Sequence, residues 1–157
     1  MDDHSSDHPA TEAARLKMEL HRVLKTLRQA DLLNERYERI IQHLDAIVLA
    51  LDPDGKILFL NDFGLKLFGY EAEELLGQQV LGTLIPVVTE DSGRYLPEML
   101  CRLLDHPESF ETNENENVTR DGKRYLVSWK NWVVQDRQGD LVEIICLGKV
   151  VKPLGHG

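Results

Sequence analysis

Residues 46–61 read AIVLALDPDGKILFLN, and this stretch points to the fold class. Two short apolar runs, 46–51 and 57–61, stand on either side of Asp-Pro-Asp-Gly. That sequence is typical of a tight turn, because glycine adopts positive φ easily while proline and aspartate favour the positions before it. The stretch therefore predicts a β-hairpin with Asn61 at the end of its second strand.

Three more strands are predicted near the C-terminus, at residues 110–119, 125–134 and 141–151. The turns between them are expected at Asp121-Gly122 and at 136–140 (DRQGD). The last strand is the most apolar of the three, so we expect it at the centre of the sheet.

Several short helices are expected between these two groups of strands, because glycine and proline repeatedly interrupt residues 62–104. The clearest helix is predicted at 96–104, where apolar residues gather on one helical face. Two strands, a run of helices and three strands together predict an α+β fold. In that fold a five-stranded antiparallel sheet carries short helices on one face.

A single long helix is predicted for residues 11–44, which contain no glycine or proline. Apolar residues recur there at alternating steps of three and four, the heptad pattern of a coiled coil. Asn34 falls at an a position, where two facing amides can pair and favour a parallel homodimer. The predicted dimer interface consists of Leu16, Leu20, Val23, Leu27, Asn34, Tyr37, Ile41 and Leu44. The alternative is one amphipathic helix folded back on its own domain.

The chain of 157 residues has the size of one domain with an appendage. We expect a disordered tail at 1–10, the coiled-coil helix at 11–44, a folded domain at 45–152 and a tail at 153–157. The formal net charge of -9 argues against a nucleic-acid partner or an anionic membrane surface, because both need clustered Lys and Arg.

A cytoplasmic location is expected for two reasons. No apolar run approaches the roughly 20 residues that span a bilayer, and the acidic N-terminus is neither a secretory signal nor a transit peptide. Cys101 and Cys146 stand in separate apolar runs and are expected to be buried free thiols. No metal site is predicted, because no set of Cys and His residues has the spacing of metal ligands.

The order of these elements resembles the PAS family over roughly residues 40–151. The motifs that carry the resemblance are 51–61 (LDPDGKILFLN), 68–70 (FGY), 73–77 (EELLG), 120–122 (RDG) and 128–131 (SWKN). Each motif alone is short, but together they occur in the family's order and at similar intervals.

The resemblance implies a sheet curled around a pocket, with the helices as a lid. PAS domains detect a small ligand, a cofactor's redox state or light, and pass the change through flanking helices, as in bacterial two-component signal transduction. One departure is that Val150-Val151-Lys152 replaces the Asp-Ile-Thr cap that leads to an output helix in many relatives. Any output is therefore expected from a signalling partner protein or from a domain outside this sequence.

The candidate ligand- or cofactor-binding residues are Phe59, Asn61, Leu100, Trp129 and Asn131. Trp129 and Asn131 lie two apart on one strand, so they share a face, which Val127 and Val133 indicate is the inner one. Apolar walls with a few amides suit a small molecule. The alternative is that Trp129 fills the core and the asparagines bond to backbone. Trp132 is expected on the opposite face as a contact surface.

The resemblance also narrows the cofactor. Val80 stands where one photoreceptor subclass has its reactive cysteine, which excludes cysteinyl-flavin photochemistry. Haem is not expected, because the helix at 96–104 lacks the histidine that haem-binding relatives supply. We expect no tightly bound cofactor, with a non-covalent flavin or a weakly held metabolite as the open alternatives.

No catalytic motif is found: the chain has neither a phosphate-binding loop nor Gly-x-Ser-x-Gly. The acidic repeat at 111–117 (ETNENEN) is interpreted as a solvated strand edge and not as an acid/base pair or calcium site. The chain is therefore expected not to be an enzyme. It is predicted to be a ligand-sensing module that signals through a dimeric N-terminal helix, or a ligand-free dimerisation and protein-interaction module.

Overall fold

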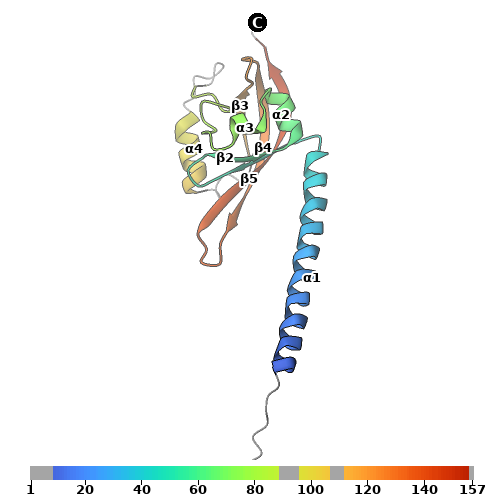
Figure 1. The fold of residues 1–157 in the computed structure, drawn as a ribbon. Helices are drawn as coiled ribbons and strands as arrows, with labels where there is room; N and C mark the ends of the chain where they lie inside the picture. The colour runs from blue at the N-terminus through green and yellow to red at the C-terminus, as the bar shows by residue number, and fades with distance from the viewer. Residues whose placement is uncertain (1–8, 89–95, 107–111, 156–157) are drawn as a thin grey trace, which may run out of the picture. The chain divides into compact units, whose positions relative to one another are not determined.

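A computed structural model describes residues 9–88, 96–106 and 112–155 of the chain. These residues belong to two compact units, divided between Ile40 and Ile41. The first unit consists of helix α1 (Pro9–Gln42), whose last two residues belong to the second unit. Figure 1 shows α1 as one uninterrupted helix, as the absence of glycine and proline predicts.

The predicted seam of α1 is open to solvent in the single chain. Its members Leu16, Leu20, Val23, Leu27 and Tyr37 are each at least 50% exposed. Asn34 is exposed as well. Ile41 is half-buried in the second unit, and Leu44 follows the end of the helix by two residues. An isolated helix with so much exposed apolar surface is the form expected of one half of a coiled coil.

The second unit is built on a five-stranded antiparallel sheet with the strand order β2-β1-β5-β4-β3. Its strands are β1 (Ile47–Leu51), β2 (Ile57–Leu60), β3 (Thr112–Val118), β4 (Arg124–Gln135) and β5 (Leu141–Leu154). β5 occupies the centre, as its apolar sequence predicts, and pairs with β1 on one side and β4 on the other.

Three short helices lie between β2 and β3 in the chain and beside the sheet in Figure 1: α2 (Asp62–Phe68), α3 (Ala72–Leu75) and α4 (Leu96–Asp105). Phe68 of α2 and Leu75 of α3 are buried in the same apolar cluster as Ile47, Val127 and Ile144 of the sheet. The helices therefore cover the sheet face that these strand residues share, and this face is called the inner face below.

The three hairpins of the sheet are closed by the same five-residue turn, at 52–56, 119–123 and 136–140. In each turn the first residue donates its N–H to the carbonyl of the fifth, over 2.8 to 3.0 Å. The fourth residue is a glycine with φ between 81° and 87°, a conformation that costs other residues free energy. Three local turn signals in the sequence thus set where the pairing of three strand pairs begins.

Candidate functional site

Trp129 and Asn131 point to the inner face of β4, as predicted from their spacing. They are 5% and 4% exposed and alternate with exposed residues on the opposite face. Val127, two residues before Trp129, is fully buried on the same face. The alternation of β4 therefore places one indole and one amide beside the apolar core.

The indole ring of Trp129 lies over Gly148 of β5, its direct partner across the two strands. A Cβ atom at Gly148 would stand 2.7 Å from the ring, closer than Cβ contacts in proteins come. The ring is also fixed at its polar end, because Trp129 Nε1 donates to Asn117 Oδ1 over 3.2 Å. Asn117 in turn donates to the Leu84 carbonyl over 3.1 Å. The indole thus occupies space that only a glycine at 148 leaves open.

Three asparagines of β3 share the inner face with Trp129, because Asn113, Asn115 and Asn117 alternate along the strand. Asn131 Nδ2 donates to Asn113 Oδ1 over 2.6 Å, and Asn113 Nδ2 donates to Asn115 Oδ1. Asn115 and Asn117 are 2% and 0% exposed. The prediction missed these three residues, although their period of two within ETNENEN is the signal that could have identified them.

The interpretation of 111–117 as a solvated acidic edge was wrong for Glu116, whose side chain is 4% exposed. Glu116 Oε1 forms an ion pair with Arg124 Nη1, which lies diagonally across the β3–β4 pair. A buried carboxylate needs such a partner, because the loss of hydration is otherwise very costly. Glu114 is exposed, and residue 111 lies outside the described residues.

Phe59 does not join Trp129 and Asn131. It pairs with Ala50 on β1, and Ala50 pairs with Ile145 on β5. Ile145 pairs with Trp132, which is 46% exposed, so Phe59 lies on the outer face of the sheet. The predicted alternation fails because the register shifts between Ala50 and Leu51, which adds one residue to β2 and reverses the facing of Phe59.

Asn61 is fully buried where β2 ends and α2 begins. An amide side chain has two donor hydrogens and an acceptor oxygen with two lone pairs, and all four positions are occupied here. The partners of Asn61 are the carbonyls of Ile41 and Ala46 and the N–H groups of Val48 and Gly64. Leu100 belongs to α4, but its side chain lies outside the described residues.

The two cysteines differ in environment. Cys146 is buried as predicted, whereas Cys101 is exposed, so the prediction of a buried thiol was wrong there. Burial raises the pKa of the Cys146 thiol to about 12 from its ordinary value of 9.0, because the interior disfavours a thiolate.

At pH 8 we expect an aromatic disulfide reagent to modify one thiol per folded chain, Cys101, and two per unfolded chain. Because the pKa of Cys146 is higher in the folded than in the unfolded chain, the free energy of unfolding also depends on pH. The contribution of this thiol is fully present below pH 9 and is lost as the pH rises toward 12. Titration of the released thiolate by absorbance measures the stoichiometry. Cys101→Ser is the control and should leave no rapidly reacting thiol. Two rapid thiols in the folded protein would contradict the assignment.

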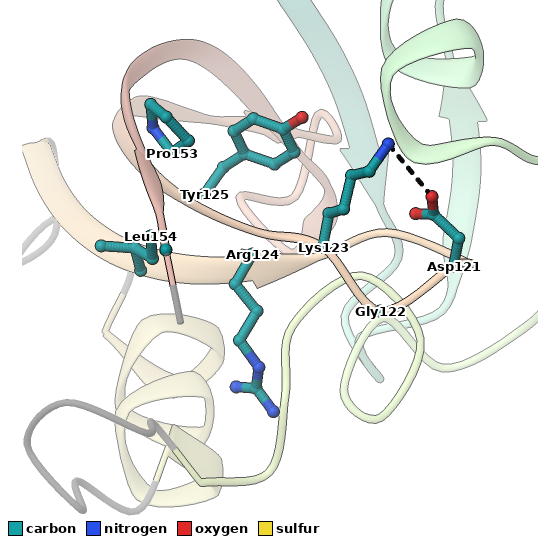
Figure 2. A pocket seen from close by; sticks show the side chains of 8 residues that line it. Asp121, Gly122, Lys123, Arg124, Tyr125, Pro153 and Leu154 are labelled. Carbon is teal, nitrogen blue, oxygen red and sulfur yellow. Dashed lines mark ion pairs between the residues drawn. The ribbon is translucent and has the colours of Figure 1, made fainter. Parts of the chain in front are cut away.

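A hollow of about 350 Å³ lies where the β3–β4 turn meets the end of β5, and Figure 2 shows the side chains that line it. Its basic side chains each have an acidic partner, since Lys123 pairs with Asp121 over 3.2 Å and Arg124 pairs with Glu116. Hydrogen bonds lower the pKa of the Asp121 carboxyl, the one from the Thr119 hydroxyl most and the one from Lys123 next. The charges of the hollow are thus internally compensated, and nothing in it favours an ionic ligand.

The described residues contain no group of three or more His, Cys, Asp or Glu side chains that could hold a metal ion. Within the same part of the chain, no helix is long and apolar enough to cross a membrane.

Comparison with known proteins gives a consistent result. The family model described as PAS fold matches residues 35–151. The PAS domain of an HTR-like protein from Haloarcula marismortui is 17% identical, with a TM-score of 0.63 over 81% of this chain and 98% of that one. A PAS domain from a two-component sensor histidine kinase is 11% identical, with a TM-score of 0.58 over 77% of this chain and 98% of that one.

A third similar structure is a light-oxygen-voltage domain studied with a flavin analogue. It is 20% identical, with a TM-score of 0.54 over 73% of this chain and 83% of that one. No curated protein sequence matches the chain. At these identities the solved structures support the fold, while the family model covers most of the chain.

Proposed function

Because the chain belongs to the PAS family, we propose that it is a non-catalytic signal-sensing module that binds a small molecule at the inner face of its sheet. The observation that carries the proposal is the set of amides on β3 and β4 beside the Trp129 indole. Buried amides amid apolar walls are the usual composition of a small-molecule site. They also stabilise the unliganded protein by bonding to one another.

The site favours an uncharged, planar ligand with hydrogen-bonding edges. The amide side chains of the site carry no charge, and Asn113 and Asn131 offer both donors and acceptors. A ligand would exchange the bonds between these amides for bonds to itself, at little net cost in hydrogen bonding. The isoalloxazine ring of a non-covalent flavin meets this description, and a solved relative was studied with a flavin analogue. A metabolite of similar polarity meets it equally.

The first experiment is an absorbance spectrum of the freshly purified protein, with mass spectrometry of any compound released on unfolding. We expect one retained compound per chain, and at least tenfold less in Asn131→Ala, because that substitution removes an inner-face amide. Ser128→Ala is the control, since Ser128 lies on the opposite face of β4. A clean spectrum with nothing released, or equal retention in both variants, would argue against the ligand site.

A second function is favoured by a separate observation. The Trp129 ring already fills the space above Gly148, and Trp132 is 46% exposed on the outer face. Phe59, Ala50 and Ile145 continue an apolar row from Trp132 across the sheet. A filled interior with an apolar outer face suits a ligand-free module that binds a signalling protein. Nothing released from the purified protein would favour this function.

In either function we propose that α1 forms a parallel homodimer and carries the signal. The apolar seam of α1 is largely exposed in the single chain, and its heptad spacing supports pairing with a second copy. Asn34 lies at the one polar position of that seam, where a paired amide fixes the register.

Replacing Asn34 by leucine is expected to raise the stability of the dimer and to broaden its choice of oligomer, because an apolar a position no longer specifies two strands. Light scattering on a sizing column measures the mass, and thermal unfolding measures stability at fixed concentration. Gln29→Leu makes a matched change at an outward c position and should alter neither quantity. The same mass and melting temperature in all three proteins would contradict the heptad assignment.

A further inference from the structure

The end of α1 and the start of α2 satisfy each other's unpaired backbone groups through two side chains. The last carbonyls of a helix and its first N–H groups have no partner within the helix. Asn61 Nδ2 donates to the Ile41 carbonyl over 3.0 Å, and Asn61 Oδ1 accepts from Gly64 N–H over 3.2 Å. Gln42 Oε1 accepts from Asp62 N–H over 2.7 Å. Two independent side-chain bonds thus link the last turn of α1 to the first turn of α2.

The same asparagine is also bonded to the start of β1 and to Ala46, which immediately precedes the strand. Its Nδ2 donates to the Ala46 carbonyl over 2.9 Å, and its Oδ1 accepts from Val48 N–H over 3.0 Å. The backbone N–H of Asn61 donates to the Val48 carbonyl over 3.0 Å. The Asn61 side chain has no exposed surface and no unused hydrogen-bonding position. It therefore cannot move with one of its bonding partners without breaking its hydrogen bond to another.

A short path leads from this asparagine to the inner face. Ile47 lies between Ala46 and Val48, the two residues that bond Asn61 here, and it pairs directly with Gly148. Gly148 lies under the ring of Trp129. The path from the Trp129 ring to the end of α1 therefore passes through the β5–β1 strand pair and the Asn61 amide.

We propose that Asn61 and Gln42 form a joint that couples the position of the Trp129 ring to the last turn of α1. The inference rests on the proposed sensing function and names how the site is connected to its helix. A molecule that enters beside Trp129 moves the ring against Gly148, which shifts β1 and changes the bonds that order residues 41–44.

The test measures hydrogen exchange of the backbone amides at residues 41–44 and needs no ligand. Gly148→Ala introduces a methyl group against the Trp129 ring and serves as the perturbation. We expect it to accelerate exchange at 41–44 at least fivefold, with a smaller change in β3. Exchange at 41–44 that is unchanged, or that rises equally throughout the sheet, would overturn the proposal.

The joint itself is tested with two substitutions of similar shape. Gln42→Met removes the acceptor for Asp62 N–H, whereas Gln42→Glu keeps it. We expect Gln42→Met to reduce the effect of Gly148→Ala at least twofold and Gln42→Glu to preserve it. If Gly148→Ala accelerates exchange equally in the Gln42→Met and Gln42→Glu variants, the role of Gln42 is overturned. If Gly148→Ala does not fold, Trp129→Phe replaces it as the perturbation, with the same expectations. Failure of the ligand proposal would appear as no released compound, independently of this exchange result.

Discussion

Replacing Asn61 by leucine is expected to lower the free energy of unfolding by about 4 kcal/mol. Leucine has the same branching and number of heavy atoms as asparagine but leaves two carbonyls and two N–H groups without their side-chain partner. Each buried polar group that loses its partner costs about 1–3 kcal/mol. Three of the four bonds are fully buried, which places the total toward the upper part of the range for single substitutions.

Urea unfolding followed by far-ultraviolet circular dichroism measures this loss. Gln29→Leu is the control, because it also replaces a side-chain amide by leucine, at an exposed and outward position of α1. We expect no loss of stability there. A loss below about 1 kcal/mol in Asn61→Leu would show that water or a rearranged backbone replaces the amide bonds.

Replacing Trp129 by alanine is expected to cost about 3–5 kcal/mol, because a large buried ring is removed and the surrounding strands collapse only in part. Trp129→Phe keeps an aromatic ring over Gly148 but loses the bond to Asn117. Its cost is expected to be about 1–3 kcal/mol, the penalty for leaving the Asn117 oxygen unpaired. Both values come from urea unfolding of the purified variants.

The alanine variant allows a second measurement. The space left by the ring has the shape of an indole and keeps the Asn117 oxygen as an acceptor. Buried cavities of this size bind small aromatic molecules, so millimolar indole is expected to raise the melting temperature of Trp129→Ala. It should leave that of the wild type and of Trp129→Phe unchanged. Equal losses of stability in the two variants, or no response to indole, would contradict the position of Trp129 as the filler of this space.

The strands were predictable from sequence because each depends on neighbours in the chain. Alternation along β4 correctly placed Trp129 and Asn131 on the inner face, and an apolar sequence placed β5 at the centre. The three turn sequences depend on aspartate or threonine and glycine within five residues, so their signal is local as well.

The wrong predictions concern residues whose environment is made by residues far away in the sequence. The extra residue of β2 has no signal in the apolar pattern, so the facing of Phe59 could not be foreseen. The partner of Glu116 lies beyond a turn, and the four partners of Asn61 lie in α1, in the link before β1, in β1 and in α2. Such contacts are created by tertiary folding, and no periodicity within one segment records them.

The position of β5 between β1 and β4 has a consequence for the order of folding. β3, β4 and β5 follow one another through short turns, so their pairing closes only small loops. Ile47 and Gly148 pair although they are roughly 100 residues apart, and such distant pairing is slow. During synthesis on the ribosome, the β1–β2 hairpin cannot pair with β5 until residues 144–148 have emerged. Until then its apolar edge is open to the β5 strand of a neighbouring copy, which makes exchange of the N-terminal hairpin between chains the expected misfolding route.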